Sequence, residues 1–146
     1  MTGEACPLPT TPAPAEITAI EKMLDAKTIA VVGISNDPFR PSRYVSEYLA
    51  EHGYEIIPIN PNHDQVLERK CLASLSALEK GPDVVLVFRR SEQCAEVARQ
   101  AAAIGAKAIW LPSGIHSDEA RRIATDAGMD YVEGRCMMIE HGGRRR

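Results

Sequence analysis

Small polar groups and arginines follow several short hydrophobic runs of the sequence, and they are the residues best suited to chemistry. The four arginines in such places are Arg40, Arg43, Arg89 and Arg90. The guanidinium group of arginine binds a phosphate through two parallel hydrogen bonds, so these residues favour a polyanionic nucleotide as ligand. The alternative is that they are solvated surface charges, with Arg43 paired to Glu47 one helical turn further on.

The segment after the first hydrophobic run can be compared with the sequence fingerprint of proteins that bind a nicotinamide dinucleotide. Its binding fingerprint needs three glycines in a tight turn and a carboxylate at the end of the second strand. Only Gly33 is present here, because Ser35 and Pro38 take the other two positions. Asn60 stands at the end of the second run, and the next carboxylate is Asp64. The sequence therefore disfavours NAD, whereas NADP stays an alternative because an arginine can hold a ribose phosphate.

Hydrophobic runs alternate with amphipathic segments from residue 28 onward, which is typical of strands buried on both faces of a parallel sheet. The predicted strands are Ile29–Gly33, Tyr54–Ile59, a short one near Arg69–Leu72, Val84–Phe88, Lys107–Leu111 and 131–132. The predicted helices are 17–25 with Thr18 and Glu21 in capping-box spacing, a segment closed by Gly53, one turn near Ser74–Leu78, a segment from the N-cap Ser91 to Gly105, and a segment from the N-cap Ser117 to Gly128.

These elements predict an α/β fold, a doubly wound, mainly parallel open sheet of Rossmann-like order in a single domain. In such a sheet, ligands bind beyond the carboxyl ends of the strands, where the strand order reverses. We therefore expect the loops after the strands to carry the site.

Length and composition limit the alternatives. The chain has 146 residues, of which 45% are hydrophobic, enough for one domain with a sizeable core. Residues 1–15 read as a disordered proline-rich leader, 16–142 as the domain and 143–146 as a basic tail. The net charge of −3 argues against general nucleic-acid binding. No hydrophobic run approaches the ~20 residues that span a membrane, and we expect no membrane partner.

The four cysteines, at positions 6, 71, 94 and 136, stand far apart, and no histidine lies in zinc-ligand spacing beside them. A disulfide framework and a structural metal site are therefore disfavoured. Such cysteine usage is typical of a reducing cytoplasm, which is where we expect the protein to act.

Several of these motifs together resemble a known family. They are Gly33-Ile34-Ser35, Arg40-Pro41-Ser42, His52-Gly53-Tyr54, Pro58-Ile59-Asn60-Pro61, Phe88-Arg89-Arg90, Lys107 to Trp110, Arg135-Cys136 and Glu140-His141. The chain from about residue 28 to 141 is similar to the small bacterial CoA-binding proteins, which are related to the CoA-binding domain of the succinyl-CoA synthetase alpha subunit. The resemblance implies coenzyme A or an acyl-CoA as the ligand.

The resemblance also implies a role for each loop. The pyrophosphate would be held by Gly33, Ile34, Ser35, Arg40 and Ser42. Adenine and the phosphorylated ribose would be flanked by Ile59, Asn60 and Pro61, and the pantetheine or the phosphates by Phe88, Arg89 and Arg90. Ser113-Gly114 occupies the place of a ligand-contacting turn. Relatives usually carry Gln-Leu-Gly after the tryptophan, where this chain has Pro112-Ser113-Gly114, so the side-chain contacts of that loop differ.

The same resemblance bears on catalysis. The synthetase subunit acts through a phosphorylated histidine on a second domain, and this chain ends where that domain would begin. The histidines here are dispersed: His52 on an apolar helix stripe, His63 and His116 after strand ends, and His141 near a flexible basic end. Cys136, beside Arg135, could form a mixed disulfide with CoA, against the alternative of a buried packing cysteine.

We therefore expect a CoA-binding module without catalytic residues. The alternatives are an NADP-dependent oxidoreductase-type domain and a detached subunit of an acyl-CoA synthetase. The sequence does not identify a protein partner.

Overall fold

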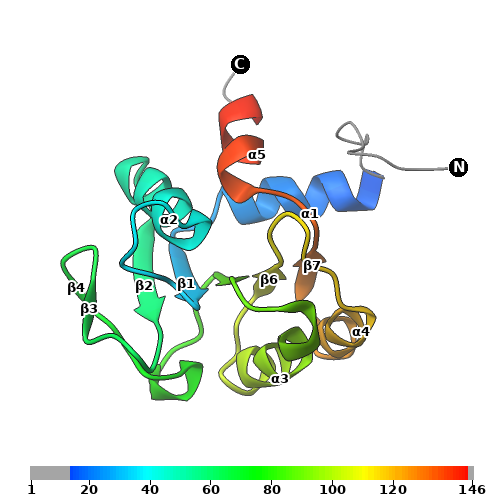
Figure 1. The fold of residues 1–146 in the computed structure, drawn as a ribbon. Coiled ribbons are helices and arrows are strands. Elements are labelled where there is room, and N and C mark those ends of the chain that lie inside the picture. The colour runs from blue at the N-terminus through cyan, green and yellow to red at the C-terminus, as the bar shows by residue number, and fades with distance from the viewer. Residues whose placement is uncertain (1–13, 145–146) are drawn as a thin grey trace, which may run out of the picture.

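Five parallel strands form the centre of the computed structural model, which describes residues 14–144 (Figure 1). Their order in the sheet is β2-β1-β5-β6-β7, and all neighbouring pairs run parallel. The strands are β1 (Thr28–Val32), β2 (Glu55–Ile59), β5 (Val84–Val87), β6 (Ala108–Trp110) and β7 (Asp130–Val132). The chain passes from β1 to β2 on one side and later returns to β5 on the other, so the strand order reverses between β1 and β5.

Helices cover both faces of the sheet (Figure 1). On one face lie α1 (Pro14–Leu24), α2 (Pro41–Glu51) and α5 (Met137–Arg144), and on the other lie α3 (Cys94–Ala103) and α4 (Asp118–Asp126). Side chains of β5 alternate between the two cores, and all four of its residues are buried. This two-sided burial is why the strands read as continuous hydrophobic runs, and the predicted doubly wound α/β fold is confirmed. Within 14–144, no helix is long and apolar enough to cross a bilayer.

The segment between β2 and β5 contains a small hairpin, of which the sequence pattern predicted only the second strand, near Arg69–Leu72. Its strands are β3 (Gln65–Val66) and β4 (Arg69–Lys70), followed by a 3₁₀ turn at Leu75–Ala77. The helical turn predicted near Ser74–Leu78 is present as this 3₁₀ turn. The turn residues Leu67 and Glu68 adopt φ of 53° and 61°. A two-residue hairpin turn with two positive φ values normally carries Asn or Gly. The usual sequence signal for a hairpin was therefore missing.

Both ends of the described chain differ from the predicted boundaries. Helix α1 begins at Pro14 rather than near residue 17, and the Thr18 hydroxyl donates to the Pro14 carbonyl, so Thr18 is not a cap. The rest of the predicted leader, residues 1–13, lies outside the described residues. Helix α5 was not predicted, and it extends through Arg144 into the predicted tail. Arg144 pairs with Asp25 just after α1, which ties this end to the domain.

The two predicted serine caps have different outcomes. Ser117 is the N-cap of α4, and its hydroxyl oxygen accepts a hydrogen bond from the Ala120 N–H at 3.0 Å, as predicted. Ser91 instead begins a 3₁₀ turn, and α3 starts at Cys94. The Ser91 hydroxyl oxygen accepts the backbone N–H of His116 at 3.1 Å. The expected cap is therefore used to join two loops at the carboxyl edge of the sheet.

Asp83 joins β1 and β5 at the opposite edge. Its carboxylate accepts the backbone N–H groups of Lys27 at 2.9 Å and Thr28 at 3.2 Å, and the Thr28 hydroxyl accepts the Asp83 N–H. Lys107 lies 3.3 Å from the same carboxylate. The hydrogen bond from Lys27, with those from Thr28 and Lys107, lowers the pKa of Asp83 below its ordinary value. Asp83 therefore stabilises the alignment of the two central strands.

The Asp83→Asn variant is expected to be less stable than wild type at pH 7. Because the folded-state pKa is depressed, the contribution of Asp83 is complete above about pH 4, the unfolded-state value, and is lost as pH falls through the lower folded-state pKa. The difference in Tm between the two proteins should therefore shrink towards pH 3. Thermal unfolding across this range measures it, with Asp126→Asn on the exposed face of α4 as the control. A Tm difference that does not change with pH would contradict the assignment.

Candidate functional site

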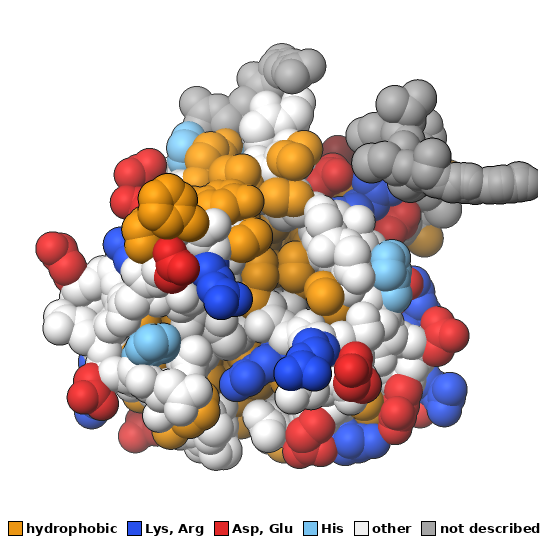
Figure 2. Space-filling model, viewed as in Figure 1, with side chains coloured by type: hydrophobic (Ala, Val, Ile, Leu, Met, Phe, Trp, Pro, Cys, Tyr) orange, Lys and Arg blue, Asp and Glu red, His pale blue; other side chains and the backbone are white. Residues whose placement is uncertain are grey.

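A cavity of about 710 Å³ opens at the carboxyl edge of the sheet, over the point where the strand order reverses. Gly33 follows β1 and Phe88 follows β5, and both line it. Its volume lies within the range of small-molecule sites, and its position is where open α/β sheets bind ligands. Figure 2 looks onto this face: hydrophobic side chains gather in a hollow below α5, and Lys and Arg side chains lie along its lower margin.

The loop from β1 to α2 depends on Gly33. This residue has φ of +85°, and a Cβ atom there would lie 2.3 Å from the Phe88 carbonyl oxygen. The Gly33 N–H donates to the Ile59 carbonyl at 2.9 Å, which extends the strand pairing into the loop. Beyond it, the Ser35 hydroxyl oxygen accepts the Asp37 N–H and the Asp37 carboxylate accepts the Phe39 N–H. Position 33 therefore has no room for a side chain beside the end of β5.

The Asn60 side chain joins the loop after β2 to the loop after β1, and its amide is hydrogen-bonded within the protein. Its side-chain NH₂ donates to the Ile34 carbonyl at 2.9 Å, and its side-chain oxygen accepts the Asn62 N–H at 2.9 Å. This use explains an amide at the end of β2, where a nicotinamide site would have a carboxylate.

Three of the four predicted arginines line the cavity. The Arg40 side chain is 70% exposed, and the carboxylate that pairs with it among residues 14–144, that of Asp37, lies 3.9 Å away, a distance at which a surface ion pair is weak. Arg89 and Arg90 line the wall after β5, and neither has a carboxylate partner among residues 14–144. Arg43 is different, because it lies outside the cavity wall and donates to the Asn36 carbonyl at 3.0 Å. Among the described residues, Arg89 and Arg90 have no carboxylate partner and Arg40 has only this weak one, so all three guanidinium groups can bind an anion.

The structure brings together most of the other predicted site residues as well. Those that line the cavity are Gly33, Ser35, Arg40, Ser42, Asn60, Phe88, Arg89, Arg90 and Ser113. Those outside its lining are Ile34, Arg43, Ile59, Pro61 and Gly114. Ile34 and Ile59 are 0% and 2% exposed, so their side chains belong to the hydrophobic core and only their backbone is near the loops.

The start of α5 forms a wall that the sequence analysis missed. Cys136, Met137, Met138 and Ile139 all line the cavity, as do Tyr44 and Val45 of α2. Arg135 orients this helix, because its side chain pairs with Glu140 at 3.2 Å and with Glu16 of α1 at 3.6 Å. Met137 and His141, four residues apart, lie on the buried face of this helix, and that spacing was the available signal for a helix. The glycines and arginines that follow His141 resembled a flexible end instead.

The histidines and cysteines differ in burial and in whether they line the cavity. His141, expected near a flexible end, is buried and its Nδ1 lies 2.9 Å from the Tyr48 hydroxyl, with the His52 ring stacked on Tyr48. His63 lines the cavity, and His116 does not. Burial raises the pKa of the Cys94 thiol to about 11, which makes it a packing residue. Cys136 is half-buried: it packs against the hydrophobic core, as the alternative of a packing cysteine expects, and it also lines the cavity.

A second cavity of about 990 Å³ lies at the amino ends of the strands. Its lysines and carboxylates largely neutralise one another, as in Lys22–Asp130 at 3.0 Å and Lys107–Asp83 at 3.3 Å. Among the residues that the structure describes, no three His, Cys, Asp or Glu side chains are grouped to hold a metal ion. The cavity at the carboxyl edge is therefore the candidate site, with cations on one side and apolar side chains on the other.

The chain is similar to proteins of known families over most of its length. A family model described as a CoA binding domain matches residues 27–142. The uncharacterized protein YneT of Bacillus subtilis (strain 168) is 38% identical over 130 residues, which cover 89% of this chain and 95% of that protein. An ADP-forming acetate–CoA ligase II of Archaeoglobus fulgidus is 30% identical over 122 residues, or 81% of this chain but 17% of the ligase.

Solved structures agree with the fold. A hypothetical protein from Pyrococcus horikoshii OT3 superposes with a TM-score of 0.84 at 34% identity, and the match covers 93% of this chain and 98% of the other.

Proposed function

We infer, because this chain belongs to the CoA-binding domain family, that it binds coenzyme A in the cavity at the carboxyl edge of its sheet. The observation that carries this proposal is the set of three guanidinium groups on the rim, Arg40, Arg89 and Arg90, beside the N-terminus of α2. Coenzyme A is a polyanion with three phosphate groups, and it needs such donors in one place. The opposite wall is apolar and suits the less charged parts of the molecule.

The proposed roles follow the loops. The pyrophosphate lies against the loop Gly33–Ser35, Ser42 and the first turn of α2, where Arg40 supplies the charge. Adenine and the phosphorylated ribose lie near Ile59, Asn60 and Pro61, which contribute backbone because the Asn60 amide is already bonded within the protein. Phe88, Arg89 and Arg90 line the path of the pantetheine or the phosphates, and the Ser113-Gly114 turn contacts the ligand through Ser113, which lies in the cavity lining.

We propose a binding role without catalysis by this module. The cavity lining contains one histidine, His63, whose ring makes no hydrogen bond or ion pair within residues 14–144. A second candidate is the CoA-binding part of an acyl-CoA-forming ligase that works with other domains or chains. The match to 17% of the acetate–CoA ligase favours it. Thioester formation from CoA, acetate and ATP by this chain alone would contradict the non-catalytic role.

A thermal-shift titration with four nucleotides tests the ligand. A ligand that binds only the folded state raises stability by RT ln(1 + [L]/Kd), so the largest shift identifies the tightest ligand. We expect CoA to give the largest shift, dephospho-CoA a smaller one, and NAD and NADP the smallest. A shift with NADP and none with CoA would establish the oxidoreductase-type alternative instead.

The Arg40→Ala variant tests whether the cavity is the binding site for CoA. A charge-assisted hydrogen bond to phosphate predicts that CoA binding weakens by about 1.5–3 kcal/mol. Calorimetric titration of wild type and variant gives this difference. Arg122→Ala, an exposed arginine of α4 far from the cavity, is the matched control and should bind CoA as wild type does. An unchanged Kd for Arg40→Ala would mean that Arg40 is a solvated surface charge and does not bind CoA.

A further inference from the structure

The loop from residue 111 to 117 forms one wall of the cavity, and Pro112, Ser113 and Ile115 are its lining residues. At its start, the Leu111 N–H pairs with the Val132 carbonyl as a continuation of the sheet. Ser113 and Gly114, at its tip, are exposed. The position of this wall therefore depends on what holds the far end of the loop, at His116 and Ser117.

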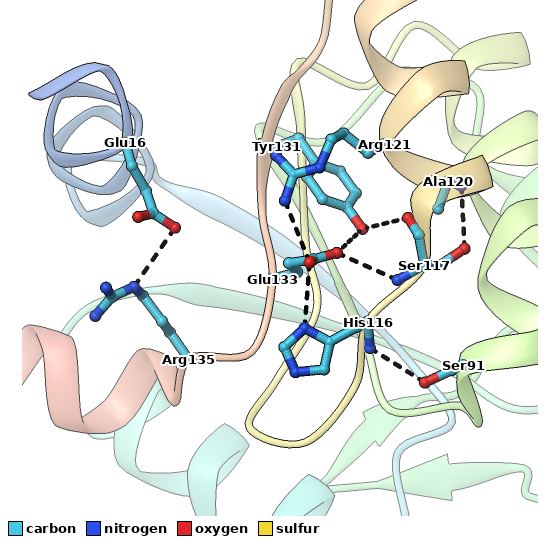
Figure 3. A network of polar contacts seen from close by, with 9 residues as sticks. All are labelled: Glu16, Ser91, His116, Ser117, Ala120, Arg121, Tyr131, Glu133 and Arg135. Atoms are coloured by element: carbon cyan, nitrogen blue, oxygen red, sulfur yellow. Dashed lines mark hydrogen bonds and ion pairs between the residues drawn. The ribbon is translucent and has the colours of Figure 1, made fainter. Parts of the chain in front are cut away.

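Glu133 holds that far end (Figure 3). Its carboxylate accepts the Ser117 backbone N–H at 3.2 Å, and the His116 Nδ1 lies 3.1 Å from its other oxygen. The Tyr131 hydroxyl donates to Glu133 at 2.8 Å, and Arg121 pairs with it at 3.2 Å. One carboxylate thus contacts two residues of the loop, a strand and α4.

The chain around Glu133 is shaped for these contacts. Gly134 has φ of +71°, and a Cβ atom there would lie 2.4 Å from the His116 ring. The absence of a side chain at 134 lets His116 pack directly on the backbone beside Glu133. Glu133 itself is 15% exposed. Burial alone would raise its pKa, but the hydrogen bonds from Tyr131, His116 and Ser117 and the charge of Arg121 lower it, so the carboxylate is ionised at neutral pH.

A second contact links the same loop to the arginines. The His116 backbone N–H donates to the hydroxyl of Ser91, the residue directly after Arg89 and Arg90. The loop therefore lies between Glu133 on one side and the arginine-bearing segment on the other. Displacing it would move a cavity wall and remove a hydrogen bond from that segment.

We propose that Glu133 is a positioning residue for ligand binding: by fixing His116 and Ser117, it holds the 111–117 loop in the conformation that completes the cavity. This inference rests on the proposed function, in that the ligand is CoA. Glu133 lies outside the cavity lining and acts through the loop. Affinity then depends on the fraction of molecules whose loop is in place.

The Glu133→Ala variant tests the proposal. If the ordered fraction of the loop falls to about one tenth, the Kd for CoA rises about tenfold, because affinity scales with the competent fraction. The Kd is measured by calorimetry at 15 °C, with the folded state verified by near-UV circular dichroism. Hydrogen exchange of the 113–117 amides, measured without ligand, should speed up in the variant. Glu133→Gln keeps an acceptor for Ser117 and Tyr131, and should restore part of the affinity.

Glu119→Ala is the matched control. It removes a carboxylate of α4 whose described ion pair, at 2.6 Å, is with Arg99 of α3 and not with the loop, so the Kd should stay at the wild-type value. A Glu133→Ala protein that is less stable but binds CoA with the wild-type Kd would overturn the inference and leave the proposed function intact. A wild-type protein that does not bind CoA would overturn the proposed function, and slow exchange of the 113–117 amides in the variant would show separately that Glu133 does not hold the loop.

Discussion

Gly33→Ala is expected to destabilise the protein by about 2–6 kcal/mol, the sum of backbone strain at a positive φ and of overpacking against a neighbour. The strain arises because φ is +85°, a conformation that favours glycine. The overpacking arises because the new Cβ would lie 2.3 Å from the carbonyl oxygen and 3.1 Å from the carbonyl carbon of Phe88. That neighbour is backbone at the end of β5, so it cannot rotate away. Urea unfolding followed by Trp110 fluorescence measures the loss.

Binding should fail together with stability in this variant. Relief of the contact needs β1 and β5 to separate at the carboxyl edge, which is where the cavity opens. Gly53→Ala is the matched control, because Gly53 has φ of +96° but open space where its Cβ would stand. It should show the strain alone, about 1–3 kcal/mol, and should bind CoA as wild type does. Equal stability of the two variants would mean that the close approach to Phe88 has no energetic effect.

Trp110→Ala is expected to cost about 3–5 kcal/mol from the cavity that it leaves, since Trp110 is completely buried in the core under α1, α2 and α5. A further loss of about 0.5–1.5 kcal/mol is expected, because the hydrogen bond that the indole N–H donates to the Arg135 carbonyl at 2.7 Å would be removed. Arg135 directly precedes Cys136 at the start of α5. The variant should therefore also weaken CoA binding, by loosening the wall that α5 provides.

Two further variants separate these effects. Trp110→Phe keeps most of the apolar contact but removes the N–H donor, so its loss should be intermediate between wild type and Trp110→Ala. Ile109→Val, on the opposite face of the same strand, should cost about 0.5–1.5 kcal/mol and leave binding unchanged. Unfolding is followed by far-UV circular dichroism, since the tryptophan is absent from two of the variants. A Phe variant as stable as wild type would argue against a role for the hydrogen bond to Arg135.

The elements that sequence analysis located best are those with a local cause. Runs such as Val84–Val87 are hydrophobic throughout because both faces of the sheet are covered, and this pattern is legible without knowing the partners. The Ser117 cap was predicted because its hydrogen bond spans three residues. Ser91 failed as a cap because its hydroxyl accepts from His116, 25 residues away, and no local pattern announces such a contact.

The candidate site divides in the same way. Arg40, Arg89 and Arg90 could be placed at the rim, because parallel strands bring all their carboxyl ends to one edge. Arg43 lies three residues after Arg40, in the first turn of α2, and has the same side chain, yet it donates to the Asn36 carbonyl and so supports the preceding loop. Which way each side chain points depends on the helix face that the tertiary packing presents. Sequence spacing alone could not separate the two.

The sequence by itself determined the alternation of strands and helices, the edge of the sheet that carries the polar loops, and the lack of the glycines and the acid that a nicotinamide site requires. Only the tertiary structure decided that α5 lines the cavity, that the Asn60 amide is hydrogen-bonded within the protein and that Glu133 contacts the 111–117 loop. The physical reason is range. Periodicity and capping arise within a few residues, whereas these contacts join segments that are distant in the chain and exist only after the sheet has formed.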